Sequence, residues 1–485
     1  MRLPFTGTLQ YIAAFTATLS YLSCGMLAGW TSPMLPRLRE PGSHLPLTAD
    51  EASWVVSATS MVMPLPVLLV PFVVDVVGRK TLLVASAVPV FASWLMVLFA
   101  ESAAMLIASR LVASLGVGAV MCVGPMYVCE VAEARVRGAL GTLFQFMLSA
   151  GSLLAFSLGP YLSYEAVAIA CAAVPVVFLA CFVWMPESPY FFALRGRDEE
   201  AERVLRRLRG SVPEEDIAQE LAVVRKCVEQ QKGCRQSWLQ LLGQLVRRRG
   251  SRRALVVCVG LMLAQVCTGL ATLLGYTTEV FQRSGAALDA DVCSIVVAAV
   301  QVATSVAAAL LADRAGRRPL LLLSCAGCAL TIAAEGVFFY LKDVVRADLS
   351  DVQWLPLTAF LGFLVFNILG LGPVPWAMVG EVFPSEVKGL ATAIVTVVLS
   401  VSSTAVAKLF QVVSDQVGMH VVFFSFSACA AAGLVFTYFC VPETKGRSFL
   451  EIMRHFEGDA TESPESTEKQ PPAVPQHPQH PALHL

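Results

Sequence analysis

Long apolar stretches recur along the whole chain, and they constrain its fold more than any other feature. A helix needs roughly 20 mostly apolar residues to cross a bilayer. Twelve such stretches can be drawn, near residues 9–31, 53–74, 81–100, 104–128, 139–162, 166–185, 254–280, 292–312, 319–341, 353–379, 389–413 and 420–441. Because the bilayer core offers no water to unpaired backbone groups, each stretch is predicted to be a helix. The sequence therefore predicts an all-α membrane protein with twelve transmembrane helices.

The charged residues are too few to cover a soluble protein of this size. They make up 15% of the 485 residues, whereas soluble domains carry roughly 25%. The net charge of −1 gives no basic face of the kind that binds nucleic acid, so no nucleic-acid partner is expected. Most of the chain is expected to contact the lipid bilayer.

The lysines and arginines predict how the chain is oriented in the membrane. If both termini are cytosolic, the cytosolic segments hold 28 of the 35 basic residues and the outer segments hold five. Basic residues concentrate on the cytosolic side of membrane proteins, which favours this orientation. We expect a multi-pass protein of the cell membrane. Neither tail carries an acidic-dileucine signal, so the endosomal membrane is the less favoured alternative.

The spans divide the chain into two halves. Residues 1–189 and 254–445 are each predicted to form a six-helix bundle. The polar segment 190–253 has helical apolar spacing and is predicted to form short amphipathic helices at the cytosolic surface. A calmodulin-binding helix is the weaker alternative, because it rests on charge alone. Residues 446–485 lose hydrophobicity and gain proline and histidine, which predicts a disordered cytosolic tail.

Three short motifs occur in both halves in the same order. An Asp precedes a Gly-Arg pair after the second and eighth spans, a Glu precedes a basic residue by seven positions after the fourth and tenth, and Pro-Glu-Ser or Pro-Glu-Thr follows the sixth and twelfth. The copies begin at Asp75 and Asp313, at Glu130 and Glu381, and at Pro186 and Pro442. This order indicates parallel structural repeats, as in transporters whose two halves rock about a central site.

The motif charges suggest a latch at the cytosolic helix ends. Ion pairs between the halves would attract while the interface is closed and separate once water enters. The residues assigned to this latch are Asp75, Arg79, Arg110, Glu130, Arg137, Glu187, Asp313, Arg314, Arg317, Glu381, Lys388 and Glu443. Its expected centre is the acid–base pairs seven residues apart, Glu130 with Arg137 and Glu381 with Lys388. The alternative is that these charges only fix the orientation of the helices.

Longer motifs follow one another in a fixed order. The first is Arg110-x5-Gly116-x-Gly118-x6-Pro125-x-Tyr127-x2-Glu130-x6-Arg137-Gly138-x6-Gln145. The others are Pro186-Glu187-Ser188-Pro189, Gly370-x-Gly372-Pro373-x-Pro375-Trp376-x4-Glu381 and Pro442-Glu443-Thr444-Lys445-Gly446. Together they resemble the sugar porters of the major facilitator superfamily, over residues 9–455. Trp30-Thr31-Ser32-Pro33 and Leu47-Thr48-x2-Glu51-Ala52-Ser53-Trp54 resemble the insect facilitated trehalose transporters and the related endomembrane-type glucose transporters.

The resemblance implies alternating access to a central site lined mostly by the C-terminal half. The positions that it assigns to sugar binding are Gln145, Gln265, Thr268, Gln301 and Trp376. An amide can both donate to and accept from a sugar hydroxyl. The alternative for each glutamine is a hydrogen bond between helices. Val266 and Ala271 occupy positions where the family usually has amides, so fewer hydroxyl partners are expected here.

Facilitative transport of trehalose or of a hexose such as glucose is the expected activity. Proton-coupled sugar porters resemble one another in an aspartate of the first span, and here that position is Leu27. Two alternatives stay open: Glu335, an acid inside the ninth span, could couple transport to protons, or the chain could be a sugar sensor that does not transport. The protein is expected to work as a monomer.

No enzymatic chemistry is expected. The sequence has no G-x-S-x-G or P-loop pattern. Cys325 and Cys328 have the spacing of metal ligands, but no second pair and no histidine stands near them. Helix packing is therefore the better interpretation. The expected partners are a small sugar and lipid, with no cofactor and no metal.

Overall fold

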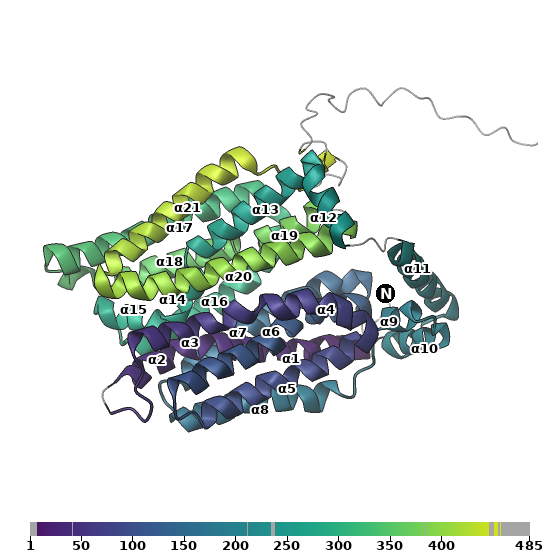
Figure 1. Ribbon diagram of the computed structural model, residues 1–485, viewed down its shortest axis with the longest axis horizontal. Coiled ribbons are helices and arrows are strands. Elements are labelled where there is room, and N and C mark those ends of the chain that lie inside the picture. Colours follow the sequence, from purple (N-terminus) through teal and green to yellow (C-terminus); the bar gives the residue numbers. More distant parts are fainter. Residues whose placement is uncertain are drawn as a thin grey trace, which may run out of the picture.

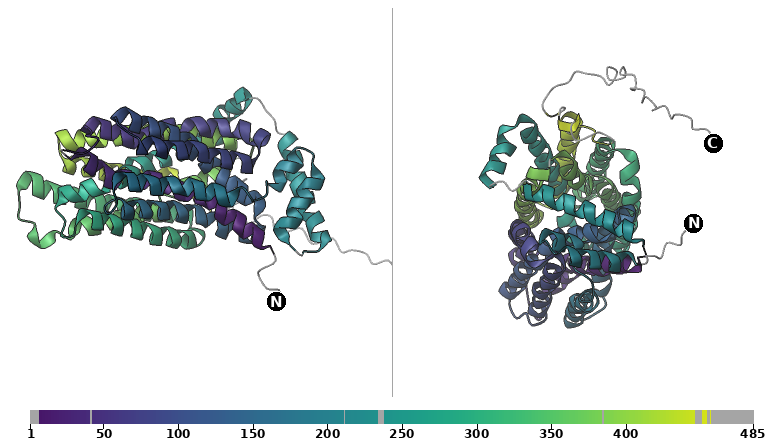
Figure 2. Two further views of the ribbon diagram at one scale, coloured as in Figure 1. Left: turned by 90° about the horizontal axis from the view of Figure 1, so that it is seen from below. Right: turned by 90° about the vertical axis from the view of Figure 1, so that its right-hand side faces the viewer.

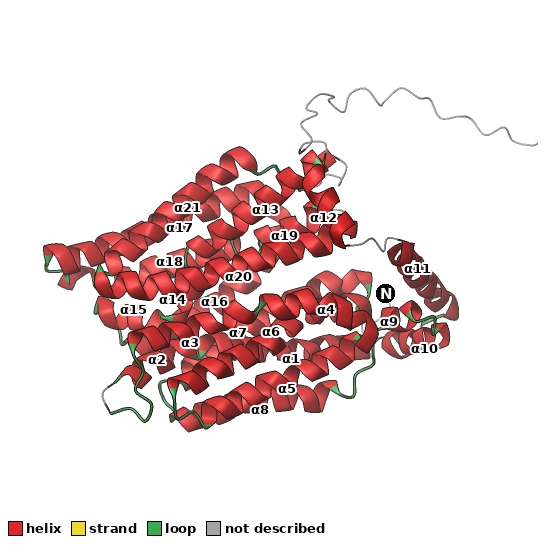
Figure 3. Ribbon diagram, in the orientation of Figure 1, coloured by secondary structure: helices red, strands yellow, loops and turns green. Residues whose placement is uncertain are grey.

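The computed structural model describes residues 7–40, 42–210, 212–233, 238–383, 385–445, 451–453 and 456. Helices make up nearly all of this part of the chain, and no strand occurs in it (Figure 3). Twelve helical segments in it are long and apolar enough to cross a membrane. The predicted fold class is therefore confirmed. Most of the predicted tail 446–485 lies outside the described residues.

The N-terminal bundle contains the first six spans. Its helices are α1 (Thr8–Gly29), α2 (Thr31–Arg39), α3 (Ala49–Val62), α4 (Pro64–Val77), α5 (Arg79–Leu98), α6 (Ala103–Val131), α7 (Ala134–Leu158) and α8 (Tyr164–Phe182). Glycines bring α1 and α7 into backbone contact. A Cβ atom on Gly25 would lie 2.0 Å from the carbonyl oxygen of Leu148, and one on Gly151 would lie 2.1 Å from that of Leu22. Small residues allow such close helix packing in membranes.

The C-terminal bundle contains six further spans, two of them interrupted. Its elements are α13 (Arg249–Cys267), α14 (Leu270–Gly275), α15 (Thr277–Ser284), α16 (Ala290–Ala315), α17 (Arg317–Tyr340), a π-turn (Leu341–Val345), a 3₁₀ turn (Ser350–Val352), α18 (Leu355–Leu369), α19 (Val374–Val382), α20 (Ser385–Gln416) and α21 (Met419–Cys440). One break lies at Gly269, whose φ is +79°, a value that glycine adopts readily. The other lies between α18 and α19, where Pro373 has no N–H to continue the helix.

Four shorter helices connect the bundles at one end of the molecule. They are α9 (Pro189–Leu194), α10 (Asp198–Arg209), α11 (Glu214–Gly233) and α12 (Trp238–Arg247). The first three pack around an apolar cluster that contains Leu205, Ile217, Leu221 and Val228, as their helical spacing predicts, whereas α12 contacts the C-terminal bundle. We call the end that carries α9–α12 the loop side, and the opposite end the far side (Figure 1).

The two bundles lie side by side, with their helices along the long axis of the molecule (Figures 1 and 2). Contacts between them run along a few helices only. α3 and α4 pack against α20, α7 packs against α16, α2 packs against α15, and α14 touches α1 and α2. Any site that lies between the bundles is therefore bordered by these helices.

Candidate functional site

A charge network at the loop side of the N-terminal bundle joins three of its motifs. The Arg79 side chain is only 2% exposed, and it lies 3.0 Å from both Asp75 and Glu130. The Ser188 hydroxyl donates to the Glu130 carboxylate. The Tyr190 ring covers the guanidinium of Arg79, with its centre 5.4 Å away. The three motifs of this half thus meet at one place.

The C-terminal bundle repeats this network with its own copies of the motifs. Arg317 donates to Glu381 at 3.0 Å, and the Thr444 hydroxyl donates to Glu381 at 2.6 Å. The second copy is more open to solvent. The side chains of Arg317 and Glu381 are 21% and 30% exposed, against 2% and 14% for Arg79 and Glu130. The two copies therefore share connectivity but differ in burial.

Glu187 has a separate role in the first network, because it caps α5. Its carboxylate accepts from the backbone N–H of Lys80 at 2.9 Å. A carboxylate here satisfies a first-turn donor and meets the positive end of the helix dipole. The approach requires a glycine: Gly78 has a φ of +102°, and a Cβ atom on it would lie 2.4 Å from Glu187. Substitution of Gly78 would displace the cap.

Glu443 caps α17 in the same way. It accepts from the backbone N–H groups of Arg317 at 3.0 Å and Arg318 at 3.1 Å, beside Gly316 with a φ of +84°. Partial burial acts to raise the pKa of the Glu443 carboxyl, but the backbone donors, Lys445 among them, outweigh it and lower that pKa from its usual value of 4.5. The cap therefore stays charged in mildly acidic solution.

The predicted pairs seven residues apart do not form in this structure. Arg137 and Lys388 each donate to a backbone carbonyl of their own bundle instead, at 3.4 Å and 2.9 Å. Their expected glutamate partners bind the arginines described above. Asp313 and Arg314 belong to the loop-side end of α16, but their side chains lie outside the described residues.

Arg110 lies away from both networks, which corrects its assignment to the cytosolic latch. It stands near the start of α6 and Glu130 near its end, a separation of about 30 Å along the helix. Arg110 is 1% exposed, lies 4.6 Å from the Trp30 ring and 5.8 Å from the Trp94 ring, and donates to the Leu27 carbonyl oxygen at 2.9 Å. It therefore belongs to the packing of the far-side half of its bundle.

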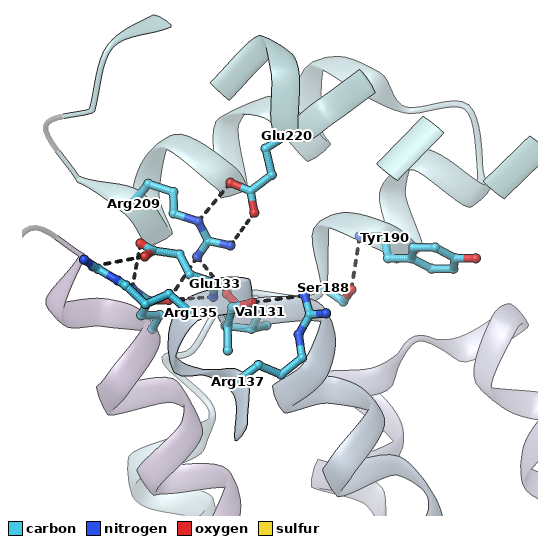
Figure 4. Close-up of polar contacts among 10 residues, drawn as sticks. Val131, Glu133, Arg135, Arg137, Ser188, Tyr190, Arg209 and Glu220 are labelled. Atoms are coloured by element: carbon cyan, nitrogen blue, oxygen red, sulfur yellow. Dashed lines mark hydrogen bonds and ion pairs between the residues drawn. The ribbon is translucent and has the colours of Figure 1, made fainter. Parts of the chain in front are cut away.

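A second polar cluster ties the loop-side helices to the N-terminal bundle (Figure 4). Arg209 of α10 pairs with Glu220 of α11 at 2.5 Å and donates to the carbonyl oxygen of Val131 at 2.8 Å. Gln10 of α1 exchanges two hydrogen bonds of 3.0 Å with Glu133. The sequence analysis did not single out these residues, because an arginine in an amphipathic helix carries no signal of its partner. The cluster fixes α10 and α11 against the end of α6.

On the far side, ion pairs join the two bundles directly. Arg39 of α2 lies 2.9 Å from Glu279 of α15. Glu279 also lies 2.6 Å from Arg283, which continues to Asp415 of α20 at 2.6 Å. The Glu279 side chain is 9% exposed, so the centre of this chain of charges is shielded from water.

A second far-side contact joins α20 to α3. The Lys408 ammonium lies 2.8 Å from both the Asp50 carboxylate and the Ser53 hydroxyl. It also lies 3.8 Å from the centre of the Trp54 ring, within the range of a cation–π interaction. Lys408 falls within the predicted span 389–413, and its partners could not be seen there because they belong to the other half of the chain.

The polar links described between the bundles lie on the far side and in the middle of the molecule. The hydroxyls of Ser32 and Thr278, 3.0 Å apart, and of Ser60 and Ser403, 3.3 Å apart, add to the two contacts above. The loop-side pairs described above, Arg79 with Asp75 and Glu130 and Arg317 with Glu381, each join residues of one bundle. The loop-side charge networks each stay within one bundle.

The two helix breaks of the C-terminal bundle bring several polar groups together. The Gln265 amide donates to the carbonyl oxygen of Gly372 at 3.2 Å, which links the two breaks directly. The Thr268 hydroxyl donates to the Gln265 backbone at 2.7 Å and accepts from the Asn367 amide at 3.1 Å. The side-chain oxygen of Gln265 is buried and has no partner in the described structure. Because such acceptors are rarely left unpaired, it is suited to a ligand hydroxyl.

Asn367 is a member of this cluster that the sequence analysis did not predict. It is fully buried in α18, and it is the single asparagine of the chain. A lone amide inside a membrane span needs a hydrogen-bond partner, which is the signal that could have marked it. Its amide holds the Thr268 hydroxyl, so its role here is to position the first helix break.

The other predicted site residues are not hydrogen-bonded to this cluster. Gln145 on α7 is exposed and lies 3.5 Å from the Ser149 hydroxyl. Gln301 on α16 is buried, and its side-chain oxygen has no partner among the described residues. Trp376 in the first turn of α19 is 40% exposed. Gln145 and Gln301 thus stand on the helices that border the bundle interface, and Trp376 beside the second break.

Glu335 lies inside α17 and is 1% exposed, with neither carboxylate oxygen paired in the described structure. α17 packs mainly against α18 and α21 of its own bundle. A charge in such a place is costly unless it is paired. The acid therefore lies away from the helices that border the bundle interface.

The paired bundles and interrupted helices have the fold of the major facilitator superfamily transporters. The xylose transporter XylE of E. coli, in a partially occluded inward-open conformation, has this fold. It aligns with a TM-score of 0.74 and 21% identity, over 91% of this chain and all of that chain. The proton:xylose symporter XylE bound to 6-bromo-6-deoxy-D-glucose aligns with a TM-score of 0.73 and 21% identity, over 93% of this chain and all of that chain.

The chain belongs to the sugar (and other) transporter family, whose family model matches residues 9–456. The facilitated trehalose transporter Tret1 of Drosophila virilis is 34% identical over 455 residues, which cover 93% of this chain and 49% of that protein. The Tret1 protein of Apis mellifera ligustica is 30% identical, over 94% of this chain and 90% of that protein. The chain spans about half the length of several curated relatives that it matches. The expected family resemblance is confirmed.

Proposed function

We propose that this protein is a facilitative sugar transporter that works by alternating access, with trehalose or a hexose such as glucose as its substrate. Family membership supports a sugar, and the names of its relatives support trehalose. The observation that carries the mechanism is the asymmetry of the bundle interface. Polar links close the far side, whereas the charge networks of the loop side stay within single bundles.

In this proposal the loop side is cytosolic, and the structure is an inward-facing state of a cell-membrane protein. The distribution of basic residues supports this orientation, because α9–α12 belong to the segment 190–253, which is richest in lysine and arginine. Tags at Met1 and Leu485 should be hidden from antibody on intact cells and accessible after permeabilisation. Surface biotinylation separates the cell membrane from the endosomal alternative.

The proposed substrate site lies between the two helix breaks and the facing bundle. Gln265 offers an unpaired acceptor beside the Gly372 carbonyl, and Trp376 presents an exposed ring at the start of α19. Gln145 and Gln301 would complete the site from α7 and α16 when the bundles close around a sugar. Thr268 takes a supporting role, because its hydroxyl already serves Gln265 and Asn367.

Transport is proposed to be uncoupled from protons. Arg110 lies against the Leu27 backbone and two aromatic rings, and it forms no ion pair in the described structure. Since position 27 is a leucine, Arg110 has no carboxylate there that could exchange a proton during transport. The unpaired Glu335 does not border the bundle interface, which argues against a coupling role.

The loop-side charges are proposed to close the cytosolic side in the outward-facing state. Glu130 and Glu381 would then keep or share their arginines while Arg137 and Lys388 reach across the interface. Glu381→Gln should therefore reach the membrane but lose most transport. Unchanged transport in both Glu381→Gln and Arg137→Ala would leave these residues as orientation signals only.

Counterflow of radiolabelled trehalose and glucose in proteoliposomes tests the whole proposal. Facilitative transport predicts exchange that a protonophore does not change, in both the wild type and Glu335→Gln. Accumulation that the protonophore abolishes would identify a symporter instead. An absence of counterflow with every sugar, in protein that binds sugar, would identify a sensor.

A further inference from the structure

A cavity of about 370 Å³ lies at the loop-side edge of the C-terminal bundle, where α13 begins and α21 ends. Its lining residues are Arg252, Arg253, Val256, Val257, Cys440 and Phe456. Val256 is 59% exposed, and because α13 spans the membrane this surface faces lipid. The cavity thus combines a cationic side with an apolar wall, and its volume is within the usual range for ligand sites.

The two arginines belong to a basic run without acidic partners. Arg247, Arg248, Arg249, Arg252 and Arg253 occur within seven residues and are all exposed. The sequence has no Asp or Glu between Glu229 and Glu279. In the described structure none of the five forms an ion pair, and the one side-chain hydrogen bond among them joins Arg253 to the Phe456 carbonyl at 3.0 Å.

Three arginines of this run, Arg249, Arg252 and Arg253, lie at the start of α13, which is the unfavourable end of a helix for a positive charge. Cations are unfavourable near a helix N-terminus, where the dipole is positive. α13 also has no acidic residue in its first turn and no side-chain cap. The positive charges of Arg252 and Arg253 therefore add to the positive end of the α13 dipole, and no acidic residue compensates them there. An anion seated in the adjoining cavity would relieve both the arginine repulsion and the dipole.

The surroundings place this anion site at the surface of the bilayer. The helix α12 ends at Arg247, the first arginine of the run, and lies at the loop-side end of α13 (Figure 1). It is amphipathic and leaves Leu242 and Val246 exposed, 42% and 51% respectively. The arginines are thus held between a helix suited to the interface and a helix that crosses the membrane. A ligand that fills this place needs an anionic head and an apolar chain.

We propose that the cavity binds an anionic phospholipid of the leaflet that faces the loop side. Its phosphate would contact Arg252 and Arg253, and one acyl chain would lie against Val256 and Val257. This goes beyond sugar transport and uses the proposed orientation only to name the leaflet as cytosolic. Basic clusters beside a membrane helix attract such lipids, with each base adding roughly fivefold.

Native mass spectrometry of the purified full chain, in micelles that contain graded dioleoyl phosphatidylserine, measures this binding without any transport assay. The wild type should retain phosphatidylserine in preference to dioleoyl phosphatidylcholine. Arg252→Gln with Arg253→Gln should weaken retention roughly 30-fold. The control, Arg203→Gln with Arg207→Gln on exposed positions of α10, removes the same charge elsewhere and should change nothing.

Two further measurements distinguish binding of a lipid from binding of other anions. Val256→Trp fills the apolar wall and should weaken phosphatidylserine retention while the arginines remain. Inorganic phosphate should fail to displace the lipid. Equal loss in the α10 control, equal retention of phosphatidylcholine, or full displacement by phosphate would overturn the proposal.

The acidic segment that follows Phe456 is the rival occupant of this cavity. Glu457→Gln, Asp459→Asn and Glu462→Gln, combined in the full chain, should leave phosphatidylserine retention unchanged. A gain in retention that requires Arg252 and Arg253 would instead assign these arginines to the chain's own tail and overturn the lipid assignment.

Discussion

The far side and the loop side of this protein use the same chemistry in opposite ways. On the far side, Arg39 and Glu279 bind across the bundle interface. On the loop side, Arg79 with Glu130 and Arg317 with Glu381 bind inside one bundle each. Arginine–glutamate pairs therefore hold the bundles together at one end and hold each bundle's own helices together at the other.

In the proposed transport cycle, this difference determines which charges can change partners. A cross-bundle pair must break when the far side opens, so it contributes to the free-energy difference between the two states. A pair inside one bundle can persist while the bundles rotate as rigid bodies. We therefore propose that the loop-side motifs stabilise each bundle throughout the cycle. The cations that would reach across are ones that bind a backbone carbonyl here, such as Arg137 and Lys388.

The largest effect is expected from breaking the buried copy of the loop-side network. Arg79→Gln leaves Asp75 and Glu130 without their cation in a buried place and should cost about 3–5 kcal/mol of folding stability. Arg317→Gln removes the same contact from a more exposed place and should cost about 1 kcal/mol or less. Denaturant titration of both variants in detergent measures the difference. Equal losses would show that burial does not distinguish the two copies.

The next largest effect is expected at the far side. Glu279→Gln weakens the links to Arg39 and Arg283, so the far side should open more readily. A coupling of about 1–3 kcal/mol would shift the population roughly 5–150-fold toward the outward-facing state. An impermeant maleimide should then label Thr31→Cys faster from outside.

The exposed Glu101→Gln is the matched control for this charge change. It lies outside the spans and has no ion pair in the described structure. Labelling of Thr31→Cys that is equally fast in both variants would show that Glu279 does not hold the far side closed.

A smaller effect is expected at the substrate site between the two sides. Gln265→Ala removes the amide that links the helix breaks and the oxygen that is left unpaired. The loss of one hydrogen bond of about 1 kcal/mol predicts roughly fivefold weaker apparent sugar affinity. Equilibrium counterflow at graded sugar concentrations measures it, with the exposed Gln219→Ala of α11 as control. Wild-type affinity in Gln265→Ala would make this glutamine a link between helices only.

The smallest effect is expected for Lys408→Met. Its partner Asp50 is 77% exposed, and exposed pairs contribute about 0.2–1 kcal/mol. Labelling of Thr31→Cys should rise less than in Glu279→Gln. The difference from wild type should shrink at high ionic strength, because salt screens exposed charges. A difference in labelling rate that does not change with ionic strength would assign the contribution of Lys408 to its packing on Trp54.

The transmembrane helices could be read from the sequence because they depend on local composition. Their ends were less accurate: α13 begins at Arg249, five residues before the predicted span, since helices continue through polar turns at the membrane surface. The motifs predicted that charges gather at the loop side, but the pairs expected between residues seven apart do not form in this structure. Arg110 shows the limit, because its motif predicted a shared function with Glu130 although the two lie near opposite ends of one helix.

The candidate site was only partly predictable for a related reason. Trp376 stands in a quoted motif and the family resemblance assigned Gln265, whereas Asn367 enters the site through a contact with Thr268 from a different span. A hydrogen bond between residues nearly a hundred positions apart leaves no local pattern. The same holds for the far-side pair of Arg39 and Glu279.

The sequence by itself determined that the chain crosses a membrane twelve times, that it consists of two related halves, and that its basic residues gather at one end. These properties follow from apolar length and charge order, which the bilayer converts directly into helices and orientation. Only the tertiary structure decided that Glu130 binds Arg79 instead of Arg137 and that Arg39 reaches Glu279. Which charges meet depends on how rigid helices pack and on which end of the bundle interface is closed, and neither is written in any one segment.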